Sequence, residues 1–300
     1  MLTIVIPSYN HEKYIYECLS AASQVSVSGI KILVIDDGST DNTPSVIKNF
    51  IDNNKDINIK LVEKKNSGLV SSLNLALELV DTEYIYMCAS DDVPVAAGVD
   101  ECYQSLRRNK ELEFCIGGAI NFHEDSKVTT DTYRKEHEEF FSIDFSENEE
   151  ALFLNYPAPL LLQSTVFRKS ALENIGGWDP KLKLDDYPTF VKLLKKYGGK
   201  SERKFIFSPD IIVVRYRHHG ANTYSNISNQ FFMVQQAMNE LASEKIRDKA
   251  IGMKAAYYLL VAMSKGDFKA VFSILKCCGL KELTGLPYYS LLIVLERIKK

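Results

Sequence analysis

The sequence predicts an α/β protein whose mostly parallel, Rossmann-like sheet is flanked by helices and followed by a helical C-terminal extension. Over roughly the first 110 residues, four apolar segments with the pattern of buried strands each precede a segment with helical spacing of its apolar residues. This alternation is typical of a parallel sheet with helices on both faces. After residue 229 only helical spacing remains. We therefore expect a sheet-containing domain over residues 1–224 and a helical region over residues 225–300.

The first two strand–helix units follow from short apolar runs and the residues that end them. Residues 2–6 are expected to form a buried strand that Pro7 stops, and helical spacing follows. Residues 30–35 give a second strand, which runs into the sequence DDGS. Thr43 is then expected to cap the next helix, with Pro44 in its first turn.

Two further units follow, and the second half of the domain is less regular. Strands are expected at residues 59–62 and from residue 84, each followed by a helix, and another strand at 113–120. Residues 123–150 are polar and weakly periodic, which predicts a surface excursion or lid. The remaining expected elements are a strand at 163–168, a helix at 169–175 stopped by Gly176-Gly177, a helix that opens at Asp185-Asp186 and a strand at 211–216.

The segment 84–92, YIYMCASDD, gives the first indication of a site. Apolar and aromatic residues precede the adjacent carboxylates of Asp91 and Asp92, as in a buried strand that ends abruptly in charge. Open α/β sheets bind ligands beyond the carboxyl ends of their strands. A plain turn is the alternative, because Asp and the following Pro94 also favour one.

Composition is ordinary for a globular protein, but charge is unevenly distributed. The 300 residues are 46% apolar and 25% charged, with a net charge of −3. Residues 245–300 contain eleven Lys and Arg against four Asp and Glu, so this segment carries +7 and the rest −10. Such a basic segment meets an anionic surface or forms a solvated helical face.

Nothing in the sequence indicates secretion or a membrane span. The six cysteines lack CxxC spacing, which is typical of reduced core thiols in a cytosolic protein. The first ten residues lack the basic flank of a signal peptide, and the late apolar run at 288–295 is far shorter than the roughly 20 residues that a spanning helix needs. We expect a cytoplasmic protein.

Carboxylates stand at the ends of two predicted strands and at the start of one helix. Clustered like charges are costly unless a cation or hydrogen-bond donors compensate for them. Carboxylate oxygens with at most one imidazole suit Mg²⁺ or Mn²⁺, which often share their shell with the phosphates of a nucleotide. Taken singly, each pair is equally compatible with a helix cap or a turn. The groups concerned are Asp36-Asp37, Asp91-Asp92, Asp185-Asp186 and the His218-His219 pair after the last strand.

Two common nucleotide-binding signatures are missing. No GxGxxG follows the first strand, and GxxxxGK[ST] does not occur. A Rossmann dehydrogenase and a P-loop ATPase are therefore both disfavoured.

The chain resembles the family 2 glycosyltransferases, which have the GT-A fold. Any one of the matching motifs is weak, but seven in the family's order over about residues 1–224 are specific. They are IVIPSYN at 4–10, VIDDGSTDNT at 34–43, NSG at 66–68, ASDD at 89–92, IGGWD at 175–179, LDDYPTF at 184–190 and RHHGAN at 217–222.

The resemblance implies an activity. Members of this kind are inverting, metal-dependent hexosyltransferases of bacterial polysaccharide or glycolipid assembly. The chain would move a sugar from a nucleotide-diphosphate sugar, with UDP expected, to a hydroxyl of a saccharide or lipid-linked saccharide. No nucleic-acid partner is expected.

The resemblance also implies roles for residues near the nucleotide. Pro7, Ser8, Tyr9 and Asp37 would line the pocket for the base, with Asp37 accepting from a pyrimidine N–H. The ASDD motif looks like the family's DXD-type motif. Its last residue, Asp92, would bind the metal, while Asp91 would face the ribose or sugar.

The later motifs carry the remaining roles. Asp185-Asp186 stands where the family has Glu-Asp, so Asp186 matches the catalytic base and Asp185 a donor contact. The family's R-x-H spacing selects Arg217 as a donor contact and His219, over His218, as the other metal ligand. Leu73 departs from the pattern, because many members place an Arg there near the nucleotide.

These parts imply a mechanism. Mn²⁺ or Mg²⁺ held by Asp92 and His219 would stabilise the departing diphosphate. Asp186, kept ionised by its place at a helix N-terminus, would remove the proton of the attacking hydroxyl. A single displacement would invert the anomeric centre. His11, His123 and His137 are assigned no function, and Trp178 would either stack on an acceptor sugar or pack under the IGGWD turn.

Two other classes remain open on sequence grounds. A nucleotidyltransferase also uses a parallel sheet, a metal and acidic residues, but its Gly-rich, Arg-containing first loop is absent. A non-catalytic binding protein is disfavoured because the candidate base and metal carboxylates are retained.

The C-terminal region lies outside the motifs. Its basic excess and the amphipathic segment 288–300, flanked by Arg297, Lys299 and Lys300, fit peripheral docking on the anionic inner face of the cell membrane. A helical cap or a homodimer face would explain the same pattern. The sequence does not specify the sugar, the acceptor or the linkage.

Overall fold

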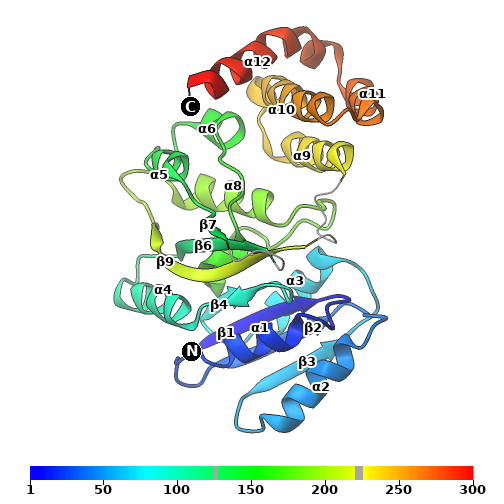
Figure 1. Ribbon diagram of the computed structural model, residues 1–300. Coiled ribbons are helices and arrows are strands. Elements are labelled where there is room, and N and C mark those ends of the chain that lie inside the picture. Colours follow the sequence, from blue (N-terminus) through cyan, green and yellow to red (C-terminus); the bar gives the residue numbers. More distant parts are fainter. Residues whose placement is uncertain (124–127, 220–225, 300) are drawn as a thin grey trace.

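The core of the molecule is a curled sheet (Figure 1). The structure, a computed structural model, describes residues 1–123, 128–219 and 226–299, with side chains as far as residue 295. Its nine described strands follow the order β3-β2-β1-β4-β8-β6-β9-β5, with β7 added to β6. The strands are β1 (Leu2–Ser8), β2 (Lys31–Asp36), β3 (Ile59–Glu63), β4 (Tyr84–Met87), β5 (Val93–Pro94), β6 (Phe114–His123), β7 (Thr129–Asp131), β8 (Thr165–Arg168) and β9 (Phe205–His218).

The sheet is mostly parallel, as the sequence predicted. Strands β1 to β4 pair in parallel, and β6 pairs in parallel with β9. Strand β8 runs antiparallel to both β4 and β6 and so joins the two parallel groups. Strands β5 and β7 are antiparallel additions.

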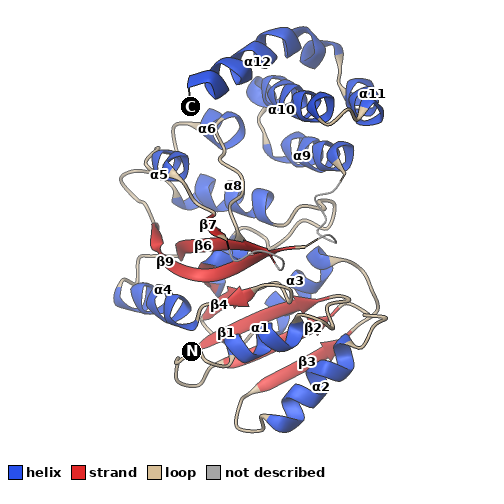
Figure 2. Ribbon diagram, viewed as in Figure 1, coloured by secondary structure: helices blue, strands red, loops and turns tan. Residues whose placement is uncertain are grey.

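Helices cover both faces of the sheet (Figure 2). Successive residues of β1 alternate between the two cores, Ile4 and Ile6 on one face and Val5 on the other, because side chains of a strand alternate in direction. The helices are α1 (Ile15–Ala22), α2 (Thr43–Asn53), α3 (Leu69–Leu79), α4 (Ala96–Arg108), α5 (Lys135–Phe141), α6 (Glu149–Leu154), α7 (Lys169–Asn174) and α8 (Asp186–Tyr197).

Among the described residues, four helices follow the sheet and form the end of the molecule opposite β3 and α2 (Figure 1). They are α9 (Ile227–Leu241), α10 (Glu244–Ser264), α11 (Phe268–Cys277) and α12 (Leu280–Lys299). Phe231 of α9 and Ala250 of α10 are fully buried in the same core as α8. None of the described helices combines the length and apolar character needed to cross a membrane. The predicted boundary at 224/225 and residues 220–222 of the last motif lie outside the described residues.

The surface excursion or lid predicted at 123–150 is wrong in part, because some of its residues enter the core. Helix α5 lies within it, and Phe140 and Phe141 are each only 3% exposed. Phe145 is buried beside them. The charged residues that made this segment look like a surface excursion lie on the outer side of a short helix whose aromatic side enters the core.

Strand β9 is longer than the predicted 211–216 because it passes through an irregularity. The register against β6 shifts on both sides of Gly118. A Cβ at Gly118 would lie 2.0 Å from the carbonyl oxygen of Pro209, so only glycine permits this approach. Pro209 is a poor strand residue except at such a bulge, which is why the sequence pattern did not include it.

His137 has a structural role in α5. It is 2% exposed, its Nδ1 accepts from the Arg134 N–H at 3.1 Å, and its Nε2 lies 3.1 Å from the Pro159 carbonyl oxygen. We expect His137→Ala to lower the free energy of unfolding by roughly 1–3 kcal/mol, the net worth of two hydrogen bonds. Chemical denaturation at pH 7.5 measures this, with the exposed His123→Ala as control.

The same variant carries a pH signature. Burial lowers the pKa of His137 below 6.5, so the unfolded state takes up the proton first as the pH falls. The stability that His137 confers is present above about pH 6.5 and declines below it. The gap between wild type and His137→Ala should therefore narrow at pH 5.5. A gap that widens on acidification would contradict this assignment.

Candidate active site

The turn after β4 carries two carboxylates with different surroundings. Asp92 is 1% exposed; its Oδ1 accepts from the Arg217 backbone N–H at 2.8 Å and its Oδ2 from Gln163 Nε2 at 3.0 Å. Burial, with the neighbouring charge of Asp91, raises the pKa of Asp92 well above its usual range. Asp92 is thus held by protein donors from β9 and from the segment before β8.

The side chain of Arg217 stabilises this turn. Its Nε donates to the Asp91 carbonyl oxygen at 2.7 Å, and its Nη2 donates to Glu17 of α1 at 2.5 Å. The guanidinium carbon also lies 4.9 Å from the ring centre of Tyr14. The side chain is 7% exposed, and its contact with the donor stays a prediction.

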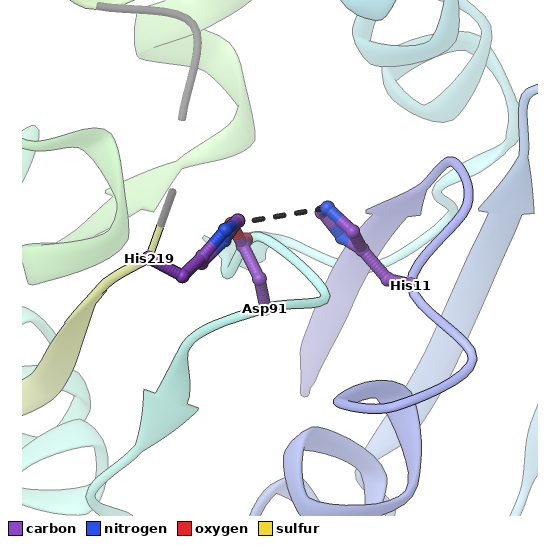
Figure 3. Close-up of side chains that lie close together, drawn as sticks. All are labelled: His11, Asp91 and His219. Atoms are coloured by element: carbon purple, nitrogen blue, oxygen red, sulfur yellow. Dashed lines mark hydrogen bonds and ion pairs between the residues drawn. The ribbon is translucent and has the colours of Figure 1, made fainter. Parts of the chain in front are cut away.

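His11, Asp91 and His219 converge from three separate segments (Figure 3). Asp91 Oδ2 lies 3.0 Å from His219 Nε2 and 3.9 Å from His11 Nε2. Candidate ligand atoms of all three residues lie within 4.8 Å of one another. The structure therefore brings Asp91, rather than the predicted Asp92, to His219. The role of Asp92 as a metal ligand stays a prediction.

His11 is the residue that sequence reasoning missed. Its backbone N–H donates to Thr43 Oγ1 at 2.8 Å, and its Nδ1 lies 2.7 Å from the Ser90 hydroxyl, which turns Nε2 toward Asp91. Burial lowers the pKa of His11, which favours the neutral imidazole that binds metals. The available signal was its position directly after the first motif, at the same sheet edge as Asp91.

The two neighbouring histidines differ in direction. His219 stacks on Tyr14, with ring centres 5.0 Å apart. His218 instead places Nε2 3.0 Å from Asn121 Oδ1 and stacks on His123. Of this pair, His219 belongs to the cluster and His218 does not; the role of His219 as a metal ligand stays a prediction.

Asp185 and Asp186 open α8 beside the same turn. The Leu162 N–H donates to Asp186 Oδ1 at 2.8 Å and fixes the orientation of that carboxylate. Burial, with the charge of Asp185, raises the pKa of Asp186 well above its ordinary value. Burial therefore outweighs the helix-terminal position that was expected to keep this group ionised.

A cleft of about 840 Å³, here called the first cleft, joins these groups. Asp92 and Asp186 both line it, although 94 positions separate them in the chain. Every residue assigned to the site from the sequence except Arg217 lines it as well. Those residues are Pro7, Ser8, Tyr9, Asp37, Asp91, Asp92, Asp185, Asp186 and His219.

The far end of the first cleft is formed by the loops after β1 and β2. The Ser8 hydroxyl is buried there without a partner among the described residues, and the Tyr9 ring is 44% exposed. Asp37 accepts from the Lys64 ammonium and from the N–H groups of Ser67, at 2.9 Å, and Gly68, at 2.8 Å. Asp37 therefore fixes the turn at residues 66–68, and its contact with a base stays a prediction.

A second cavity of about 750 Å³ adjoins the first cleft. Asp185, Asp186, Tyr216 and His219 line both. Helices α9 and α10 supply much of the remaining wall. Two spaces thus meet at the acidic pair that opens α8.

Trp178 packs rather than faces a ligand. It is 3% exposed, and its backbone N–H and carbonyl oxygen pair with the Asn74 amide at 3.0 and 2.7 Å. Of the two sequence-based alternatives for Trp178, the structure selects packing under the turn.

The comparison with known families decides the class of this protein. Residues 3–174 match the model described as Glycosyl transferase family 2. The chain belongs to this family. The predicted resemblance is confirmed, and the family's members include relatives that the chain resembles over most of its length.

Two such relatives come from Pasteurella multocida. A hyaluronan synthase is 29% identical and a chondroitin synthase of strain Pm70 is 26% identical, each over 245 residues and 80% of this chain. The chain spans only 23% of the length of either relative.

Solved structures confirm the predicted GT-A fold of this family 2 member. S. aureus TarS 1-349, in complex with UDP-GlcNAc, matches with a TM-score of 0.58 at 17% identity, over 88% of this chain and 72% of that one. The mannosyltransferase PcManGT from Pyrobaculum calidifontis, in complex with GDP-Man and Mn²⁺, matches with a TM-score of 0.60 at 17% identity, over 97% and 84% of the two chains.

The cluster geometry predicts how Mn²⁺ binding responds to substitution. We expect His11→Ala and Asp91→Asn each to weaken Mn²⁺ binding by about tenfold or more, because each removes a candidate ligand. Electron paramagnetic resonance titration of free Mn²⁺ measures this without an activity assay. His218→Ala is the matched control, since its ring pairs with Asn121 and should leave Mn²⁺ affinity unchanged.

Asp92→Asn separates the structural assignment from the sequence-based one. If Asp91 is the ligand, this variant should weaken Mn²⁺ binding less than Asp91→Asn does. Loss of Mn²⁺ binding in Asp92→Asn, with His11→Ala unaffected, would contradict the cluster.

Proposed function

We propose that this family 2 glycosyltransferase transfers a sugar from a UDP-sugar to a hydroxyl group of a saccharide acceptor. The observation that carries the proposal is that the first cleft and the second cavity meet at Asp186. Donor and acceptor would occupy the two spaces, with the reacting atoms at their junction. Relatives named for chondroitin and hyaluronan synthesis support a glycan acceptor.

The first cleft suits a nucleotide. The orphaned Ser8 hydroxyl can hydrogen-bond to a ligand, and the exposed face of Tyr9 offers a stacking surface for a base. Lys13 and Lys183 line the same cleft and supply positive charge for a diphosphate, where Leu73 replaces the Arg of other members. TarS structures with UDP-GlcNAc and UDP show that this fold accommodates such ligands.

The cluster of His11, Asp91 and His219 fits a divalent cation. Two imidazoles with one carboxylate suit Mn²⁺ better than Mg²⁺, which prefers oxygen ligands. When bound, such an ion supplies Lewis-acid stabilisation of the departing diphosphate. Ser90 holds the His11 ring, and Arg217 holds the turn that carries Asp91.

Asp186 is placed to act as the base. An acceptor hydroxyl in the second cavity would lose its proton to Asp186 while its oxygen bonds to the anomeric carbon. The bond from that carbon to the diphosphate oxygen breaks in the same step, and the nucleoside diphosphate leaves with the electron pair. Attack from the face opposite the leaving group inverts the anomeric centre. A raised pKa brings the base closer to neutrality, where a general base is most effective.

Asp186→Asn tests this role. We expect turnover to fall by about 10² to 10⁴-fold, the usual contribution of a general base, while donor binding persists. Wild-type activity should rise with pH along a limb displaced above the ordinary aspartate pKa of about 4, because only ionised Asp186 accepts a proton. Initial rates and calorimetric UDP binding measure the two effects, with the exposed Asp210→Asn as control.

Four results would contradict the proposed function. Normal turnover of Asp186→Asn would exclude Asp186 as the base. A product whose anomeric configuration is retained, as observed by NMR, would exclude a single displacement. Donor binding without any transfer by the wild type would favour the non-catalytic alternative. Release of pyrophosphate from a nucleoside triphosphate would instead identify a nucleotidyltransferase.

We also propose that α11 and α12 dock on an anionic membrane surface. Phe268, Phe272 and Leu275 form an exposed stripe at helical spacing on α11, with side chains 75%, 62% and 38% exposed. Leu280, Tyr288, Leu291 and Leu295 of α12 are exposed as well. The exposed Lys269 and Lys276 of α11 accompany this apolar surface, a combination that favours anionic lipid. The predicted flanking Arg297, Lys299 and Lys300 have side chains outside the described residues.

Vesicle sedimentation of the full chain tests the docking surface. Truncation at residue 245 is unsuitable, because it would remove buried residues of α10. We expect wild type to sediment with vesicles containing phosphatidylglycerol and Phe268→Ser/Phe272→Ser to stay in solution, with Leu79→Ser on α3 as control. Equal partitioning of both proteins would contradict membrane docking. Elution as a dimer that these substitutions dissociate would assign the surface to self-association.

A further inference from the structure

The second cavity contains a cation that the protein leaves unpaired. Lys254 of α10 lines the cavity and is only partly exposed. Within the described part of the chain, its ammonium has neither an ion pair nor a hydrogen bond. By contrast, Lys249 on the same helix lies 3.3 Å from Glu150, and Lys195 lies 2.8 Å from Glu149.

An unpaired, partly buried ammonium is costly unless a ligand completes its surroundings. Burial lowers the pKa of Lys254, and no neighbouring charge contributes to that shift. Asp185 and Asp186 line the same cavity, but neither lies within ion-pair distance of the lysine. The cavity therefore has an acidic end at its junction with the first cleft and a separate basic position on α10.

Aromatic side chains occupy much of the remaining wall. Lys254, Tyr257 and Tyr258 follow the three- and four-residue spacing that places side chains on one face of a helix. Tyrosine combines an apolar ring with a polar hydroxyl, so it can pack against the C–H groups of a sugar and hydrogen-bond to its hydroxyl groups. The other tyrosines of the cavity are Tyr156, Tyr187 and Tyr216.

We propose that Lys254 binds a negatively charged group, a phosphate or a carboxylate, carried by the acceptor. The tyrosines would hold the adjoining sugar, and the hydroxyl to be glycosylated would face Asp186. This inference rests on the proposed function, which makes the second cavity the acceptor site. It restricts the class of acceptor to anionic glycans, and it assigns Lys254 of α10 a contribution to acceptor specificity.

Binding of three defined probes tests the proposal without knowledge of the natural acceptor. Chondroitin tetrasaccharide carries carboxylates, a glycerol phosphate trimer carries phosphates, and chitotetraose is neutral. We expect wild type to bind one of the anionic probes at least tenfold more tightly than chitotetraose in calorimetric titration with UDP and Mn²⁺ present. The probe that binds more tightly identifies the charged group.

Variants of Lys254 then locate the effect. Lys254→Gln should weaken binding of the preferred anionic probe by about tenfold or more, the worth of a hydrogen bond to a charged group, and leave chitotetraose and UDP binding unchanged. Lys254→Arg should retain most of the affinity. Lys265→Gln, at the exposed end of the same helix, is the matched control, and melting temperatures verify that each variant folds.

The outcomes separate the inference from the function on which it rests. Anionic binding that is unchanged in Lys254→Gln, or no preference of wild type for either anionic probe, would overturn the role of Lys254. Failure of wild type to bind UDP or any UDP-sugar, with Lys254-dependent binding of the anionic probe intact, would instead overturn the proposed donor.

Discussion

The pairing of the turn after β4 with strand β9 is the constraint on which the site depends. Val93 of β5 pairs with Arg215, and two residues later the Arg217 backbone N–H donates to Asp92 while its side chain donates to the Asp91 carbonyl oxygen. His219 then lies 3.0 Å from Asp91. In the sheet β4 and β9 are separated by β8 and β6, so the curl of the sheet and the short β5 bring their ends together. Loss of this connection would separate the ligand atoms of the cluster.

The same connection brings together carboxylates that repel one another unless donors or a cation compensate for their charge. Asp91, Asp92, Asp185 and Asp186 line one cleft, and burial raises the pKa of both Asp92 and Asp186. Protein donors compensate Asp92, whereas Asp91 faces two imidazoles. Asp92 is therefore held by protein donors and Asp91 is directed at the two imidazoles, while burial raises the pKa of Asp186 above its ordinary range. This division follows from the partners of each group, since the four side chains are chemically identical.

Sequence patterns were sufficient for what is local. The strands β1 to β4, the helices after them and the acids at the strand ends follow from periodicity and turn residues over a few positions. Burial on both faces makes β1, β2 and β4 nearly continuous apolar runs, which is why they were recognisable. Helix α5 was not predicted because most residues of its segment are polar or charged. Phe140 and Phe141 are its only apolar residues, which is too few to produce a helical periodicity.

The unpredicted parts of the site depend on contacts between distant segments. His11 joins the cluster only because Thr43 and Ser90 hold its backbone and ring. Arg217 stabilises the turn because its guanidinium donates hydrogen bonds to both Glu17 and the Asp91 carbonyl oxygen. Lys254 lies beyond every recognised motif and enters the second cavity through the packing of α10 against the sheet-containing domain. No local pattern encodes such proximities.

Crystals soaked with MnCl₂ and UDP give the most direct test of the central claim, that one cation position and one base adjoin across the first cleft. We predict an anomalous manganese peak bonded to Asp91 and to the imidazoles of His11 and His219, with the UDP diphosphate bound to the same ion and Asp186 facing the adjacent space. A manganese peak elsewhere, or UDP bound outside the first cleft, would contradict the account.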